Sequence, residues 1–285
     1  MDFTDPVSYV GNNMFAARVH VLLARDARVG VVIRRGPSKK VCTVLWDRQT
    51  DQFRVGQWLN GRIYERRSDI SPDGKYLIYF AMNGRWHSEA KGSWSAISRA
   101  PYLKAIAMFP KGDCWHGGGL FTDKTKYWLN DGCGHSEMRN THEVRRDLKF
   151  KPSNYFGGEC PGVYYLRLMR DGWEHIERRG AKLQEIDVFE KPLREGWILR
   201  KLAHSEVGAP PGKGCYWDEH ELVRPQSERL VECPDWEWAE LDNKRLVWST
   251  EGKLYAARIR LAGLVDEREL FDFNKLNYER IEAPY

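Results

Sequence analysis

Short apolar runs alternate with turn sequences along most of the chain. The clearest run is Tyr76–Met82, which lies between Pro72-Asp73-Gly74 and Asn83-Gly84. Proline presets one turn angle, aspartate caps its own backbone, and glycine accepts a positive φ. The run itself is aromatic and β-branched and is too short for a typical helix. The pattern therefore predicts a buried strand bounded by two tight turns.

The same unit recurs, with an acidic turn residue, a basic residue and then an apolar run. It appears at residues 26–33, 73–80, 123–129 and 242–248, and the first copies follow one another at about 50 residues. The last interval is wide enough for two periods, and we expect residues 162–169 to be a strand of the obscured copy. A period of this length with several short strands is typical of propeller blades.

The motif Ser71-Pro72-Asp73-Gly74-Lys75-Tyr76-Leu77, with its counterpart at 241–248, resembles the blade signature of TolB-like β-propellers. It is also similar to the wider class of tryptophan–aspartate repeat propellers. The resemblance implies an all-β propeller, with five blades expected and six as the alternative. It further implies a ring closed by an N-terminal strand, for which residues 17–24 are the candidate. It implies no particular function, because propellers have many.

Further pairs of apolar runs lie in the sequence between the repeated units. Asn60-Gly61 is a hairpin turn signal, and Glu251-Gly252 joins another pair of runs. The runs expected to be strands are 40–46, 53–58, 62–66, 94–98, 104–109, 182–189, 197–202, 216–223, 245–248 and 253–259. The 285 residues are within the range of one large all-β domain, so we expect a single domain over residues 1–285.

Charge and targeting signals narrow the class of protein. The net charge is +5, and the basic pairs are scattered among acidic residues. A nucleic-acid binder should instead show a concentrated basic stripe, so nucleic acid is not expected as a partner. The N-terminal residues are acidic where a signal peptide needs basic ones, and no apolar stretch reaches membrane-spanning length. We expect a cytoplasmic protein with six reduced cysteines and no membrane association.

Two Cys-x-His sequences provide the densest candidate for chemistry. They are Cys114-Trp115-His116 and Cys133-Gly134-His135, and two thiolates with two imidazoles would suit tetrahedral zinc. The spacing matches no common zinc module, and the neighbouring glycines favour a structural reading in which Cys114 is a small buried residue. No cofactor is therefore expected, with zinc as the alternative. A metal-assisted hydrolase or lyase near Cys114–His135 is the alternative function.

Aromatic residues in loops indicate a different kind of site. Tryptophan and arginine dominate protein interfaces, and they lie among histidines and acids in two loop segments. The candidate partner-binding residues are Arg85, Trp86, His87, Trp94, Trp115 and His116. By contrast, we interpret Asp218-Glu219-His220-Glu221 as a solvated hairpin edge.

These observations favour a non-catalytic protein-binding propeller. No Gly-x-Ser-x-Gly motif is present, and no catalytic residue is predicted. A dedicated inhibitor, or an immunity protein that neutralises a toxin partner, is the concrete form we expect. Such a protein would be monomeric by itself and would bind a protein partner.

Overall fold

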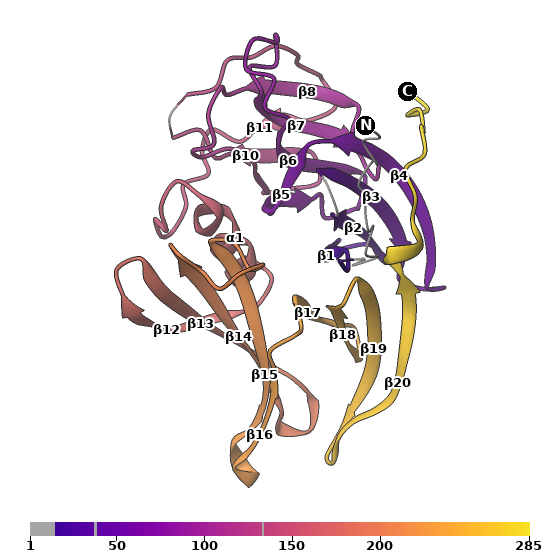
Figure 1. Cartoon of the computed structure of the whole chain (residues 1–285), viewed down its shortest axis with the longest axis vertical. Helices are drawn as coiled ribbons and strands as arrows, with labels where there is room; N and C mark the ends of the chain where they lie inside the picture. Colours follow the sequence, from indigo (N-terminus) through magenta and orange to yellow (C-terminus); the bar gives the residue numbers. More distant parts are fainter. Residues whose placement is uncertain (1–14, 37–38, 133) are drawn as a thin grey trace, which may run out of the picture.

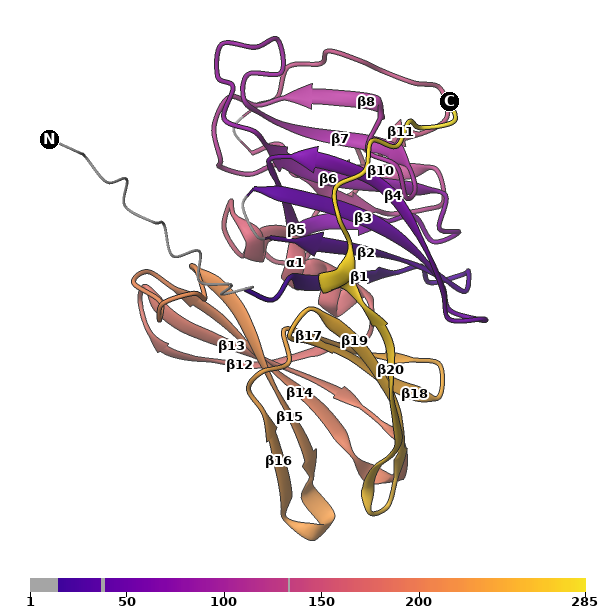
Figure 2. The ribbon, with the colours of Figure 1, turned by 45° about the vertical axis from the view of Figure 1, so that its right-hand side comes forward.

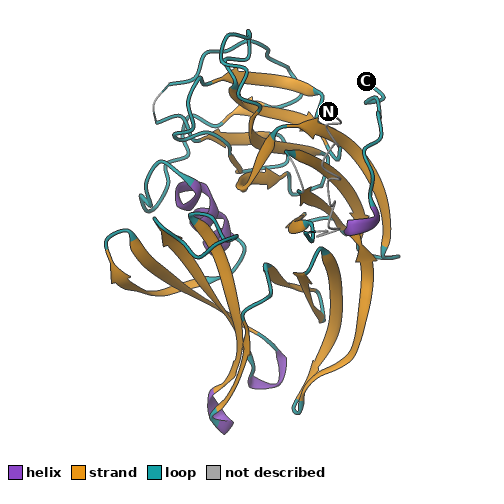
Figure 3. Cartoon of the chain, in the orientation of Figure 1, coloured by secondary structure: helices purple, strands orange, loops and turns teal. Residues whose placement is uncertain are grey.

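A computed structural model describes residues 15–36, 39–132 and 134–285. Strands dominate, and they form five separate sheets in chain order (Figure 1, Figure 3). Sheet one contains β1 (Arg18–Leu23), β2 (Val29–Arg35), β3 (Lys40–Asp47) and β4 (Gln52–Asn60). Sheet two contains β5 (Arg62–Ile70), β6 (Tyr76–Met82), β7 (Ser93–Arg99) and β8 (Ala105–Pro110). Both are antiparallel meanders, in which each strand pairs with the next in sequence.

The second half of the chain continues this plan with more variation. Sheet three is small and contains β9 (Gly119–Phe121), β10 (Lys126–Leu129) and β11 (Arg145–Arg146), of which β11 is parallel to β10. Sheet four contains β12 (Glu174–Ala181), β13 (Gln184–Pro192), β14 (Ile198–Glu206), β15 (Tyr216–Arg224) and β16 (Arg229–Cys233). Sheet five contains β17 (Trp238–Asp242), β18 (Arg245–Thr250), β19 (Lys253–Arg260) and β20 (Gly263–Asp272). Sheets four and five are antiparallel throughout.

The turn before β6 shows how the repeated motif builds a strand entry. The Ser71 hydroxyl donates to Asp73 Oδ1 at 2.7 Å, and the Gly74 amide donates to the Ser71 carbonyl at 2.8 Å. Gly74 has a φ of 77°, which glycine adopts without strain. The apolar residues that follow are buried along β6, so the predicted turn and strand are confirmed.

Apolar clusters hold neighbouring sheets together. Ile33 and Leu77 belong to a cluster between sheets one and two, and Ile78 and Phe121 to one between sheets two and three. Trp197 and Trp248 join sheets four and five. The remaining contact links the end of the chain to its start, since Trp46 and Val247 share a cluster of sheets one and five (Figure 2). These four pairs of sheets are therefore joined by apolar packing.

Helix α1 (Cys160–Arg170) lies between sheets three and four and reaches inward. It contacts β5, β9 and β12, and its residues Cys160–Leu168 are buried. The expected strand at 162–169 is therefore wrong. Aromatic and β-branched residues such as Val163, Tyr164 and Tyr165 favour a strand locally, but the segment forms a helix that is covered on nearly every side, with Pro161 in its first turn. Among the described residues, no helix is long and apolar enough to cross a membrane.

The N-terminal strand does not close a ring in the predicted way. β1 pairs with β2 in sheet one, while sheet five is completed by β17–β20 alone. Side chains connect the two sheets instead: the Ser249 hydroxyl donates to the Val19 carbonyl at 2.8 Å, and Arg34 Nε donates to the Phe273 carbonyl at 3.2 Å. The prediction failed because β17–β20 already form a four-stranded sheet five, while β1 pairs with β2 in sheet one.

The segment after sheet five crosses the outside of sheet one and reaches sheet two (Figure 2). Gln57 Nε2 donates to the Ile281 carbonyl at 2.9 Å, and the Tyr285 hydroxyl donates to the Lys104 carbonyl at 2.7 Å. The Tyr278 ring lies 5.9 Å from the Trp58 ring. Residues 276–285 thus tie three sheets together from outside.

Candidate functional site

Buried charged residues from sheets two and four and from helix α1 meet in the interior of the molecule. Asp218 of β15 is at the centre of this group, with only 3% of its surface exposed. The Tyr164 hydroxyl of α1 donates to Asp218 Oδ2 at 2.6 Å, and Arg66 Nη2 of β5 lies 3.2 Å from Oδ1. Burial opposes ionisation of Asp218, but the charges of Arg66 and Lys201 outweigh it and hold the pKa of this carboxyl well below its usual range. We call Arg66, Tyr164, Lys201, Asp218 and His220 the central polar cluster.

Two buried histidines beside this cluster are neutral. Arg167 Nη2 donates to His20 Nε2 at 2.8 Å, so the ring proton of His20 lies on Nδ1. His220 is arranged alike: Nδ1 donates to the Trp236 carbonyl at 2.8 Å, and Nε2 accepts from Lys201 Nζ at 2.8 Å. Burial, followed by the neighbouring positive charge, lowers the pKa of both rings well below the ordinary value. Neither histidine is therefore a cation in the folded protein near neutral pH.

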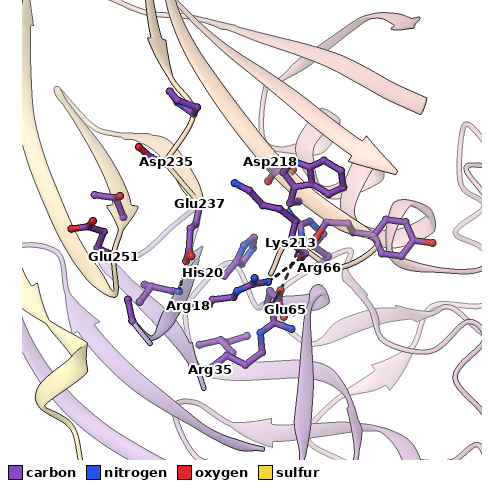
Figure 4. A pocket seen from close by; sticks show the side chains of 17 residues that line it. Arg18, His20, Arg35, Glu65, Arg66, Lys213, Asp218, Asp235, Glu237 and Glu251 are labelled. Atoms are coloured by element: carbon purple, nitrogen blue, oxygen red, sulfur yellow. Dashed lines mark hydrogen bonds and ion pairs between the residues drawn. The ribbon is translucent and has the colours of Figure 1, made fainter. Parts of the chain in front are cut away.

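A pocket of about 300 Å³ opens above the polar cluster. Four sheets contribute to its walls, and we call it the central pocket (Figure 4). Its charged and polar residues are Arg18, His20, Arg35, Glu65, Arg66, Lys213, Tyr216, Asp218, Asp235, Glu237, Thr250 and Glu251. Within the described chain, Glu65 Oε2, Asp218 Oδ1 and Trp217 Nε1 are buried without a hydrogen-bond partner, and all three residues line this pocket. Such unpartnered buried atoms are uncommon in native proteins.

A second depression adjoins the central pocket and shares Tyr216 with it. Its volume is about 420 Å³, and three exposed apolar side chains line it: Trp115, Leu183 and Val207. Phe156 and Pro161 also contribute to its wall, while charged residues such as Arg178 and Glu206 surround it. We call this depression the apolar groove, and the end of the molecule that carries both depressions the pocket face.

Leu183 has a backbone conformation that is unusual for a leucine. It is in the two-residue turn between β12 and β13, where Ala181 pairs with Gln184. Its φ is 74°, a left-handed conformation that normally requires glycine or asparagine at this point of a turn. The side chain is 58% exposed, so core packing does not explain the leucine.

The predicted partner-binding residues are divided between surface and core. Arg85, Trp86 and His87 are exposed in the loop between β6 and β7. The ring of Trp86 lies against Gly92, where an added Cβ would be 2.5 Å away. Trp94 is 8% exposed and packs in the cluster between sheets one and two, so this residue is not available to a partner. It follows Ser93 on β7, where every residue from Ser93 to Ser98 is buried because both faces of the strand are covered.

Trp115 and His116 lie in the loop between β8 and β9. Trp115 is exposed at the apolar groove. His116 is half-buried, and its ring fits between Gly132 and Gly158, where an added Cβ would lie 2.2 Å and 2.5 Å from ring atoms. The tryptophan therefore belongs to the pocket face, while the histidine orders the loop that carries it.

The Cys-x-His residues do not converge in the described part of the chain. His135 is buried, with Nδ1 2.7 Å from Asp131 Oδ1 and Nε2 3.1 Å from the Ser95 hydroxyl. Both of its nitrogens are thus occupied. Cys114 is exposed, and Cys133 lies outside the described residues. No three or more His, Cys, Asp or Glu side chains within the described ranges are arranged to hold a metal ion.

Sequence reasoning missed the central polar cluster. Asp218 and His220 are buried, whereas Glu219 and Glu221 point outward, so the predicted solvated edge is wrong for half of its residues. The signal was the alternation itself, because Asp218 and His220 share a strand face with the buried Leu222. Arg66 and Arg67, one of the scattered basic pairs, are likewise buried on β5.

Comparisons with known proteins give little beyond the fold. No family description matches the chain, and no curated protein is similar to it in sequence. Among solved structures, hydrazine synthase of Kuenenia stuttgartiensis matches with a TM-score of 0.35 and 12% identity, over 90% of this chain and 80% of that one. An uncharacterized protein of Listeria monocytogenes EGD-e matches with a TM-score of 0.30 and 8% identity, over 90% and 66%. The tricorn protease matches with a TM-score of 0.29 and 10% identity, over 90% and 30%.

Proposed function

We propose that this chain is a five-bladed β-propeller that binds a partner protein on its pocket face without catalysing a reaction. The five sheets serve as blades, and apolar contact between sheets five and one supports a closed ring. A dedicated inhibitor or immunity protein is the form we favour, because no reactive group is needed for that role. A monomeric state and a cytoplasmic location remain predictions of the sequence.

The observation that carries the proposal is Leu183. A leucine held at a φ of 74° costs free energy that asparagine or glycine would not. Residues with strained backbone conformations are concentrated at functional sites, where binding or catalysis requires a side chain in that position despite the strain. Because Leu183 extends into the apolar groove while remaining 58% exposed, contact with another molecule is the purpose we infer.

The other exposed side chains of the apolar groove also support contact with a partner. Trp115 and Val207 are exposed in the same groove, although they come from loops far apart in the sequence. Binding energy in protein interfaces is concentrated in such aromatic and apolar anchors, surrounded by a polar rim. Arg178, Lys182 and Glu206 supply charged groups around this groove. We infer that the partner inserts an apolar side chain here.

Affinity capture from the native host, followed by binding measurements with the purified partner, tests this function. We expect Trp115→Ala and Leu183→Asn each to weaken partner binding by about tenfold, the typical effect of removing an interface anchor. Leu261→Asn is the matched control, since Leu261 is 59% exposed in the two-residue turn between β19 and β20, away from both depressions. Equal binding by all three variants and the wild type would refute the assignment.

Arg85 and Trp86 extend the test to the neighbouring loop. This loop and the Trp115 loop meet at one end of sheet two, where the Ser93 hydroxyl donates to the Asp113 carbonyl at 2.6 Å. A partner that covers both loops should also bind less tightly to the Arg85→Ala, Trp86→Ala double variant. Unchanged affinity would restrict the contact to the apolar groove.

A further inference from the structure

A second charged pocket, of about 490 Å³, is lined by residues of sheets one and five. Within the described chain, it shares no lining residue with the central pocket or the apolar groove. Val247 and Ala256 belong to the apolar cluster between these two sheets. Strand alternation places Arg245 and Arg258 two residues from them on the same face of sheet five, where the two arginines are opposite each other. The apolar contact between the sheets thus gives way to a charged region.

Two arginines of this pocket are neutralised by two carboxylates. Asp242 accepts from Arg48 Nε at 2.9 Å through Oδ1 and from Arg245 Nε at 3.0 Å through Oδ2. Both oxygens of Asp51 accept from Arg245 at 2.7 Å, and Oδ2 also accepts from Arg268 Nη2 at 2.8 Å. Burial opposes ionisation of Asp51, but Arg245 and Arg268 outweigh it and lower the pKa of this carboxyl. All four carboxylate oxygens are therefore already occupied by donors of the protein.

Four further cations line this pocket, and all of them are exposed: Arg28, Lys244, Arg258 and Arg268. One more carboxylate, Asp266, lies among them and pairs with Arg258 at 2.7 Å. Within the described residues, Lys244 Nζ has no partner, and Arg28 donates one hydrogen bond, to the Arg48 carbonyl at 3.3 Å. Six cations and three carboxylates therefore line the pocket, an excess of three positive charges. We call it the basic pocket.

The fold brings these cations together at a cost in free energy. Arg245 and Arg258 are directly opposite on neighbouring strands, an arrangement in which like charges destabilise a sheet. A bulge in the pairing of β19 with β20 then places Arg268 opposite Ala256 and Val265 opposite Arg258. Because opposite residues share a face, Arg268 joins the two other arginines on one side of sheet five. Bulges that redirect side chains in this way are common beside functional sites. An anion with several negative charges would offset the repulsion among these cations.

We propose that the basic pocket binds the diphosphate or triphosphate group of a small molecule. Arg28, Lys244 and Arg268 contact the phosphate oxygens, since each has N–H donors that the protein leaves open. One phosphate group carries about −1.5 to −2 charges, so two linked groups match the excess of three positive charges better than one. The volume of the pocket is in the range of small-molecule sites. Because the basic pocket and the pocket face are lined by different residues, this proposal does not depend on the proposed function.

Calorimetric titration of the protein with inorganic pyrophosphate, in magnesium-free buffer of low ionic strength that limits screening, tests the site. We expect saturable binding of one molecule, and binding of inorganic phosphate that is weaker by about tenfold because it reaches fewer cations. Arg28→Gln and Lys244→Gln should each weaken pyrophosphate binding by about fivefold, and the double variant should bind more weakly than either. Arg280→Gln is the matched control, because its side chain is 85% exposed outside the pocket, and it should bind pyrophosphate as the wild type does.

Thermal unfolding provides a second measurement that also shows whether the variants fold. Arg28 and Lys244 are exposed, so their substitution should leave the unfolding midpoint of the free protein unchanged. Pyrophosphate should raise the midpoint of the wild type and not that of the double variant. The proposal is overturned by the absence of saturable binding, by equal pyrophosphate affinity in the double variant and the wild type, or by equal affinity for phosphate and pyrophosphate. Tighter binding of a short single-stranded oligonucleotide that requires Arg28 and Lys244 would also overturn it, because the pocket would then bind a nucleic-acid backbone.

Discussion

Replacing Leu183 separates the cost of its backbone conformation from the value of its side chain. Leu183→Asn removes the apolar side chain and also suits the left-handed φ of 74°. Leu183→Ala removes the same side chain but keeps a residue that resists this conformation. The stability difference between the two variants therefore reports the strain alone.

The expected size follows from the cost of left-handed backbone. This cost is about 1–2 kcal/mol for an ordinary residue, and asparagine avoids much of it. We therefore expect Leu183→Asn to be about 1 kcal/mol more stable than Leu183→Ala, which corresponds to about 2–4 °C in the midpoint of thermal unfolding for a protein of this size. Partner affinity should fall by about tenfold in both variants, because both lose the leucine that lines the apolar groove.

Denaturant and thermal unfolding followed by tryptophan fluorescence provide the stability measurement. The same pair of substitutions at Leu261 is the control, since that exposed turn residue has no left-handed φ. At position 261, the asparagine variant should be no more stable to unfolding than the alanine variant. The reasoning is refuted if asparagine and alanine at position 183 give equal stability, or if either variant binds the partner as tightly as the wild type.

Two further predictions concern the scaffold. Asp242 accepts hydrogen bonds from Arg48 and Arg245, and 1% of its side chain is exposed. Asp242→Asn should lower the free energy of unfolding by about 2–3 kcal/mol in urea titrations, because Arg48 loses its carboxylate partner while Arg245 keeps its pair with Asp51. Asp266→Asn, in an exposed pair with Arg258, should change it little, and equal effects would contradict the account. Burial lowers the pKa of His20 and His220, so below pH 6.5 the unfolded chain binds protons that the folded protein does not. The free energy of unfolding should therefore fall as the pH drops below 6.5, by up to about 2 kcal/mol per histidine at pH 5. His20→Gln should make the free energy of unfolding depend less steeply on pH between pH 7 and 5, whereas His87→Gln, at an exposed position, should not. An unchanged dependence in His20→Gln would show that the His20 ring is protonated in the folded protein.

The sequence predicts the regular antiparallel sheets well and the irregular part poorly, for a physical reason. The motif around Pro72-Asp73-Gly74 specifies its turn through contacts within a few residues, so it can be read locally. The segment at Cys160–Arg170 contains aromatic and β-branched residues that favour a strand locally, and it forms a helix that tertiary packing buries on nearly all sides. The contact between sheets one and five also depends on residues more than 200 positions apart.

The residues of the candidate site also divide into those that local sequence identifies and those that depend on tertiary structure. Loop tryptophans at 86 and 115 could be identified as surface candidates from composition and neighbouring turns, and both are exposed. Trp94 could not be distinguished from them, because its burial comes from neighbouring segments that cover both faces of β7. Leu183 and Glu65 were invisible at the level of sequence, since backbone strain and an orphaned oxygen exist only in three dimensions.

The central claim is that the pocket face binds a protein partner, and amide hydrogen exchange with and without the captured partner tests it most directly. The account predicts that protection on binding is concentrated in residues 111–118, 182–183 and 207–215, the loops around the apolar groove. Protection confined to residues 24–28, 48–51 and 71–75, the turns at the other end of sheets one and two, would contradict it.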